Sequence, residues 1–166
     1  MSEEAKVVAV LVANPALSSI LTMVLAAVPS LRVRPFDSQI ALSTYMRLAP
    51  VDLIVSDFDS ERAPADRVAR DLHSDTSLER RDFQVIALAT TVTAETKRAS
   101  ISAGIDEIIV KPMSPKYLLE RVLSRLERRM AVPPAPRMHR APRAVDFAAA
   151  GSNVIPLFGR RFETTH

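Results

Sequence analysis

Asp57 and Lys111 are the two residues whose types and positions point most directly to chemistry. Asp57 ends the hydrophobic run 51–57, and Lys111 directly follows a second such run, 107–110. If both runs are strands of one parallel sheet, their carboxyl ends lie along one edge, where sheets of this kind bind ligands. A carboxylate can attack a phosphoryl group there if a nearby cation offsets the negative charges. The pair therefore predicts phosphate handling.

Apolar runs and helical patterns alternate along the first 130 residues. Short apolar runs predict five strands, at 7–12, 31–36, 51–57, 83–89 and 107–110. Capping residues, prolines and helical spacing predict helices that begin at Pro15, at Asp37 or Ser38, near Ala65, at Thr93 and at Pro115. Five strands alternating with five helices predict a parallel sheet covered on both faces. The expected fold is α/β, a flavodoxin-like doubly wound domain.

Composition restricts the classes of protein to which the chain can belong. Its 166 residues are 48% hydrophobic and 25% charged, as expected for one folded domain with an extension. The absence of cysteine excludes disulfides, thiolate metal sites and cysteine nucleophiles. No apolar run approaches the roughly 20 residues that span a bilayer. The acidic start, with no secretory signal, favours a cytoplasmic protein without a membrane partner.

Charge and proline content divide the chain near residue 131. Residues 1–110 hold 11 Lys/Arg against 15 Asp/Glu, a net charge of −4, whereas residues 111–166 hold 11 against 4, a net charge of +7. Five of the 12 prolines lie in 131–166. We expect a domain over 5–130 and a Pro/Arg-rich, mostly disordered tail over 131–166. An apolar island at 153–159 either folds back onto the domain or docks on another protein.

Over residues 5–130 the chain resembles the receiver domain of bacterial two-component response regulators. The resemblance rests on the strand that ends in Asp57, on the phrase 103–112, which contains Gly104 and Lys111-Pro112, and on the order of the elements. It implies that Asp57 accepts a phosphoryl group from a histidine kinase or phosphotransfer protein and that Lys111 pairs with the phosphoryl oxygens. It also implies that Asp57 and the main-chain carbonyl of Asp59 help to hold Mg²⁺ and that the Lys111–Pro112 peptide is cis.

The chain departs from the receiver pattern in three parts of the functional site. The acidic pair that holds Mg²⁺ in receivers falls on Ala13 and Asn14, so metal binding is expected to be weak or lost, with only a neutral oxygen from Asn14. The Thr/Ser position falls on Ala89, and the neighbouring Thr90 is expected to face the other way. Ile108 stands where receivers carry a Tyr or Phe that moves on activation.

Three functions remain open on this basis. The first is a stand-alone phosphoacceptor receiver in a phosphorelay, and the second is a pseudo-receiver that binds proteins independently of phosphorylation. A weaker third is nonspecific nucleic-acid binding through the basic tail, and sequence-specific DNA binding is not expected, because no helix-turn-helix is recognisable. Beyond its own phosphorylation, the chain is not expected to be an enzyme.

The surfaces that would bind a downstream partner are the last helix and the tail. The last helix carries five cations outside its apolar stripe, Lys116, Arg121, Arg125, Arg128 and Arg129. We favour a solvated face for these cations over a partner-binding patch. Asp52 and Asp59 are expected to be solvated or capping carboxylates. The sequence leaves open whether the protein is a homodimer.

Overall fold

Buried apolar strands form the centre of the computed structural model, which describes residues 4–131 and 154–156. The strands are β1 Lys6–Leu11, β2 Leu31–Pro35, β3 Leu53–Asp57, β4 Gln84–Ala89, β5 Glu107–Val110 and β6 Val154–Pro156. They make one sheet in the order β2-β1-β3-β4-β5-β6, and the first five are parallel. All five residues of the central β3 are buried, because the strand is covered on both faces.

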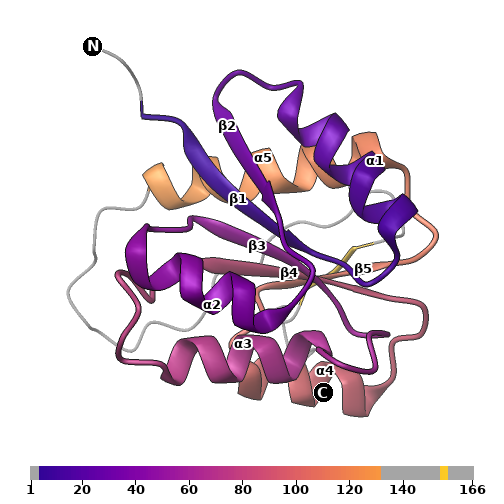
Figure 1. Cartoon of the computed structure of the whole chain (residues 1–166). Helices are drawn as coiled ribbons and strands as arrows, with labels where there is room; N and C mark the ends of the chain where they lie inside the picture. The colour runs from indigo at the N-terminus through magenta and orange to yellow at the C-terminus, as the bar shows by residue number, and fades with distance from the viewer. Residues whose placement is uncertain (1–3, 132–153, 157–166) are drawn as a thin grey trace, which may run out of the picture.

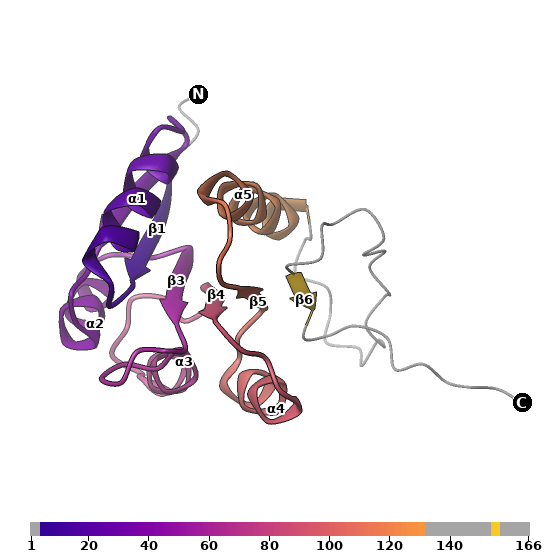
Figure 2. The ribbon, with the colours of Figure 1, turned by 90° about the vertical axis from the view of Figure 1, so that its right-hand side faces the viewer.

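Five helices cover the sheet in two layers (Figure 1). They are α1 Pro15–Ala26, α2 Gln39–Leu48, α3 Ala65–Ser74, α4 Ala94–Ala103 and α5 Pro115–Ala131. Side chains of α1 and α5 pack on one face of the sheet, and those of α2, α3 and α4 pack on the other. Figure 2 shows the two layers of helices on either side of the sheet. The five parallel strands and five helices confirm the predicted flavodoxin-like α/β fold. In the described part of the chain, no helix is both long enough and apolar enough to span a membrane.

Local capping signals set where the helices begin and end. The side chain of Asn14 accepts the Leu17 N–H at the start of α1, and Ser38 accepts the Ala41 N–H at the start of α2. Gly104 ends α4 in the left-handed conformation, with φ of 80°. A Cβ on this glycine would lie 2.9 Å from the His73 ring. Both this close contact and the positive φ disfavour a larger residue at the position.

The strand order places the carboxyl end of β3 between the ends of its neighbours. The Phe58 N–H, just after β3, donates to Leu88 O of β4 at 2.8 Å, and the Lys111 N–H, just after β5, donates to Ala89 O at 2.9 Å. The segments that directly follow β3 and β5 are therefore both bonded to the end of β4. This carboxyl edge of the sheet carries both Asp57 and Lys111, as the sequence predicted.

A sixth strand, β6, extends the sheet beyond the five that the sequence predicted. It pairs antiparallel with β5, with Ile155 opposite Ile108 and Pro156 opposite Glu107. Part of the apolar island at 153–159 thus folds back onto the domain, one of the two alternatives that the sequence left open. The rest of the predicted tail, 132–153 and 157–166, lies outside the described residues.

The direction of the β5 amides explains why a proline fits in β6. The Lys111 N–H points to β4, and N–H groups alternate along a strand, so the Ile108 N–H points the other way, toward β6. Ile155 lies opposite Ile108 and is therefore the residue that exchanges hydrogen bonds with β5. The nitrogen of Pro156 then points outward, where its missing N–H removes no ladder bond and blunts the new sheet edge.

This register predicts a selective loss of amide protection in an Ile155→Pro variant of the full chain. The substitution removes the N–H that Ile155 donates to the Ile108 carbonyl and places a proline ring against β5, so β6 should detach. The Ile108 N–H then loses its acceptor, the Ile155 carbonyl, and its hydrogen exchange should speed up at least about tenfold. The Ile109 amide, which faces β4, should be unchanged. Residue-resolved exchange by NMR measures both.

A Pro156→Ala variant is the matched control and should leave the Ile108 amide protected. Equal exchange of the Ile108 amide in the wild type and in Ile155→Pro would show that β6 does not pair with β5 in solution.

Candidate functional site

The Asp57 carboxylate and the Lys111 ammonium group form the centre of the site. Lys111 Nζ lies 3.1 Å from Oδ1 and 3.0 Å from Oδ2 of Asp57. The Asp57 side chain is only 6% exposed and that of Lys111 20% exposed, so the pair is largely shielded from water. The structure thus brings together the two residues that the sequence singled out, 54 positions apart. A buried carboxylate of this kind is stable only with such a partner.

Asp59 contributes its side chain to the same cluster. Its Oδ2 lies 2.8 Å from Lys111 Nζ and accepts two hydrogen bonds from Thr90, from the backbone N–H at 2.9 Å and from the hydroxyl at 2.6 Å. The Asp59 N–H in turn donates to Asp57 Oδ1 at 2.8 Å. One ammonium group is therefore shared between two carboxylates, and Thr90 holds the outer one.

The structure differs from the sequence-based predictions for three residues, Thr90, Asp59 and Asp52. Thr90 was expected to face away from the site, but strand alternation does not apply to it because β4 ends at Ala89. Asp59 is predicted to be a solvated or capping carboxylate; its side chain is exposed, as predicted, but it is also ion-paired with Lys111. The same expectation was wrong for Asp52, which is buried and accepts the Val7 N–H at 2.9 Å.

The charges in this cluster shift each other's protonation equilibria. Burial raises the pKa of Asp59, but the hydrogen bonds from Lys111 and Thr90 outweigh it, so the pKa lies below the ordinary aspartate value. For Lys111, burial lowers the pKa, but the hydrogen bonds to Asp59 and Asp57 outweigh it, so the pKa lies above the ordinary lysine value. Asp59 and Lys111 therefore both stay ionised at neutral pH.

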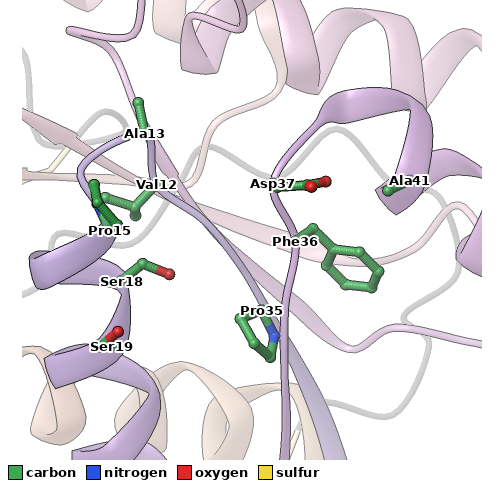
Figure 3. A pocket seen from close by; sticks show the side chains of 9 residues that line it. All are labelled: Val12, Ala13, Pro15, Ser18, Ser19, Pro35, Phe36, Asp37 and Ala41. Carbon is green, nitrogen blue, oxygen red and sulfur yellow. The ribbon is translucent and has the colours of Figure 1, made fainter.

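The loop after β1 offers little negative charge. Ala13 ends in a methyl group, and Asn14 Oδ1 accepts the Leu17 N–H at 3.1 Å as the cap of α1. Beside this loop lies a hollow whose lining includes one carboxylate, that of Asp37 (Figure 3). Figure 3 shows this carboxylate pointing toward Ala41 of α2.

The two other altered positions are buried in the core. Ala89 and Ile108 are both within 1% of complete burial and belong to the cluster between the sheet and the layer of α2, α3 and α4. Ala89 brings no hydroxyl group to the end of β4. The Lys111–Pro112 peptide is cis, as predicted.

Solved structures with the same arrangement are numerous, although sequence comparison alone finds no relative. No protein-family model matches the sequence, and no curated protein matches it significantly. The structural matches described below are between 17% and 22% identical to this chain. Their shared feature is the receiver domain. The chain has the receiver fold.

Three of these matches show the range of receiver-fold proteins. A CheY-like response regulator receiver domain protein from Methanospirillum hungatei has a TM-score of 0.68 at 17% identity, over 77% of this chain and 98% of that one. A receiver domain of a histidine kinase from Syntrophus aciditrophicus has a TM-score of 0.65 at 20% identity, over 82% and 99%. The response regulator DrrB of Thermotoga maritima has a TM-score of 0.65 at 22% identity, over 75% and 54%, so the chain spans about half of it.

The residues at the receiver metal position do not fit a tight Mg²⁺ site. Ala13 has no side-chain oxygen, and the oxygen of Asn14 is engaged in capping α1. Asp57 and Asp59 both bond Lys111. Within residues 4–128, no group of three His, Cys, Asp or Glu side chains is placed to hold a metal. Mg²⁺ prefers several hard anionic oxygens, which this cluster does not offer.

Two arginines of α5 are structural, contrary to the solvated face that the sequence favoured. Glu107 is the first residue of β5, so it lies at the amino ends of the strands, whereas Asp57 lies at their carboxyl ends. Its side chain is completely buried. Both Arg121 and Arg125 bond its carboxylate, with Arg121 Nε at 3.1 Å and Arg125 Nη2 at 3.0 Å. A buried carboxylate requires such partners, and these two cations are therefore not available to a ligand. Lys116 and Arg128 remain exposed on α5.

The Thr90 amide should report the titration of Asp59. Because the folded-state pKa of Asp59 lies below its unfolded value, its ionised form stabilises the fold above the unfolded pKa, and this contribution is lost as the pH falls through the folded pKa. The Thr90 amide shift in NMR should therefore titrate with a midpoint below the ordinary aspartate value. An Asp59→Asn variant should show no such step. A midpoint at or above the ordinary value would contradict the described network.

An Arg121→Met variant should lose stability because it leaves Glu107 with one arginine. We expect the free energy of unfolding in urea to fall by roughly 2 kcal/mol, less than for a fully abandoned buried charge because Arg125 remains. Arg128→Met removes the same charge from an exposed position of the same helix and should change stability by less than about 0.5 kcal/mol. Equal losses in the two variants would contradict a structural role for Arg121.

Proposed function

We propose that this chain is a receiver module of a two-component or phosphorelay pathway and that Asp57 is its phosphoacceptor. The observation that carries the proposal is the Asp57–Lys111 ion pair at the carboxyl edge of the sheet, with both Asp57 oxygens near Lys111 Nζ. The donor would be a phosphohistidine on a histidine kinase or phosphotransfer protein. Lys111 would offset the charge of the incoming phosphoryl group.

Signalling would take place by protein–protein interaction in the cytoplasm. The downstream partner would bind the last helix or the tail, and Mg²⁺ binding would be weak or lost. A nucleic-acid partner is less well supported, because Glu107 engages two of the α5 arginines. The chain would not be an enzyme beyond accepting its own phosphoryl group.

A second candidate function is a phosphorylation-independent binding module, a pseudo-receiver. It is favoured by a specific set of observations: Ala13 and the capping Asn14 at the metal position, and Asp59 and Thr90 at the Lys111 ammonium group. In this case partner binding would be insensitive to Asp57→Asn and would depend on α5 or the tail.

Intact-mass measurement after incubation with acetyl phosphate and Mg²⁺ tests the first proposal. The wild type should gain a phosphoryl adduct, and Asp57→Asn, which keeps the shape of the side chain but not its nucleophilic charge, should gain none. Asn14→Asp is an informative companion, because aspartate caps a helix as well as asparagine does and adds one metal-ligand charge. An adduct on Asn14→Asp but not on the wild type would favour the pseudo-receiver.

A further inference from the structure

The donors around Asp59 are those that a phosphoryl group would need. Its Oδ2 accepts from one ammonium group, one hydroxyl and one backbone N–H, at 2.8, 2.6 and 2.9 Å. Charged and hydroxyl donors of this kind make the strong, short hydrogen bonds that bind carboxylates and phosphates alike. The carboxylate of Asp59 is thus an anion already bound beside the nucleophile.

The two carboxylates that share Lys111 differ in how easily they can move. Asp57 is 6% exposed and lies at the end of a fully buried strand, so its position is fixed by packing. Asp59 is 40% exposed, lies in the loop after β3 and lines an open groove of about 920 Å³. Asp59 can therefore turn into solvent without opening the core.

We propose that Asp59 is an internal anion that competes with the phosphoryl group for Lys111 and Thr90 and so restrains phosphorylation of Asp57. This inference rests on the proposed function of Asp57. In the resting state Asp59 neutralises part of the Lys111 charge and occupies both Thr90 donors. Phosphorylation requires its carboxylate to leave, which frees the ammonium group, the hydroxyl and the N–H for the new phosphoryl oxygens.

The reaction with a small phosphodonor is simple to balance. A carboxylate oxygen of Asp57 forms a bond to the phosphorus of acetyl phosphate, and the bond between that phosphorus and the acetyl oxygen breaks. Acetate leaves with the electron pair, and Asp57 becomes an acyl phosphate. Negative charge collects between Asp57 and Asp59 as the phosphorus arrives, so like-charge repulsion adds to the competition for Lys111.

The test compares rates of adduct formation in acetyl phosphate with Mg²⁺ for the wild type and Asp59→Asn. Asparagine keeps an oxygen for Thr90 but removes the charge that binds Lys111, so the rate should rise on the order of tenfold. Glu61→Gln is the matched control. Glu61 is an exposed carboxylate that lines the same groove, and the contacts of Lys111 do not include it. Its rate should equal that of the wild type.

The outcomes separate this inference from the proposed function. Modification of wild type and Asp59→Asn at equal rates would overturn the inference and leave Asp57 as the phosphoacceptor. Acceleration in Glu61→Gln as large as in Asp59→Asn would overturn it too, because the effect would then be one of general charge. No adduct on either protein would overturn the proposed function and the inference together.

Two further variants guard against indirect effects. Asp59→Ser is a second way to remove the charge and should accelerate the reaction as Asp59→Asn does; thermal melting verifies that both are folded. The double variant Asp57→Asn/Asp59→Asn should gain no adduct. An adduct on this double variant would place the reaction on another residue and contradict the inference.

Discussion

The site depends on the Lys111 ammonium group, which is shared between the carboxylates of Asp57 and Asp59. Lys111 is the one cation in contact with Asp57 in the described part of the chain, and it also holds Asp59. The Asp57 carboxylate is buried at the end of a strand, and a buried carboxylate requires a partner such as this cation. The carboxyl ends of three strands assemble this cluster, since Asp57 ends β3, Thr90 directly follows β4 and Lys111 directly follows β5.

The fold fixes the position of the Asp57 carboxylate, whereas the Asp59 carboxylate is free to change its orientation. Asp57 ends β3, whose neighbours β1 and β4 hold it on both sides, whereas Asp59 lies two residues into a loop. The contact from the Asp59 N–H to Asp57 Oδ1 couples the two, since the turn that orients one also positions the other. With no carboxylate at Ala13 or Asn14, the balance between Asp57 and Asp59 governs the charge at this edge.

Much of this arrangement could be predicted from the sequence, and what was missed has physical reasons. Alternating apolar runs and caps predicted the five parallel strands and the meeting of Asp57 with Lys111. The alternation of side chains along a strand predicted the wrong direction for the Thr90 side chain, because β4 ends at Ala89 and the alternation does not continue beyond it. The role of Arg121 follows from the burial of Glu107, an acidic residue at the start of an apolar strand that needed a partner. The pairing of β6 depends on contacts distant in sequence, which periodicity does not reveal.

The most direct measurement is the alkaline titration of the Lys111 side chain by NMR. In the wild type its pKa should lie above the ordinary lysine value, because the hydrogen bonds to Asp59 and Asp57 outweigh burial. Asp57→Asn and Asp59→Asn should each lower it. A wild-type pKa at or below the ordinary value, or one that neither substitution lowers, would contradict the sharing of the Lys111 ammonium group between Asp57 and Asp59.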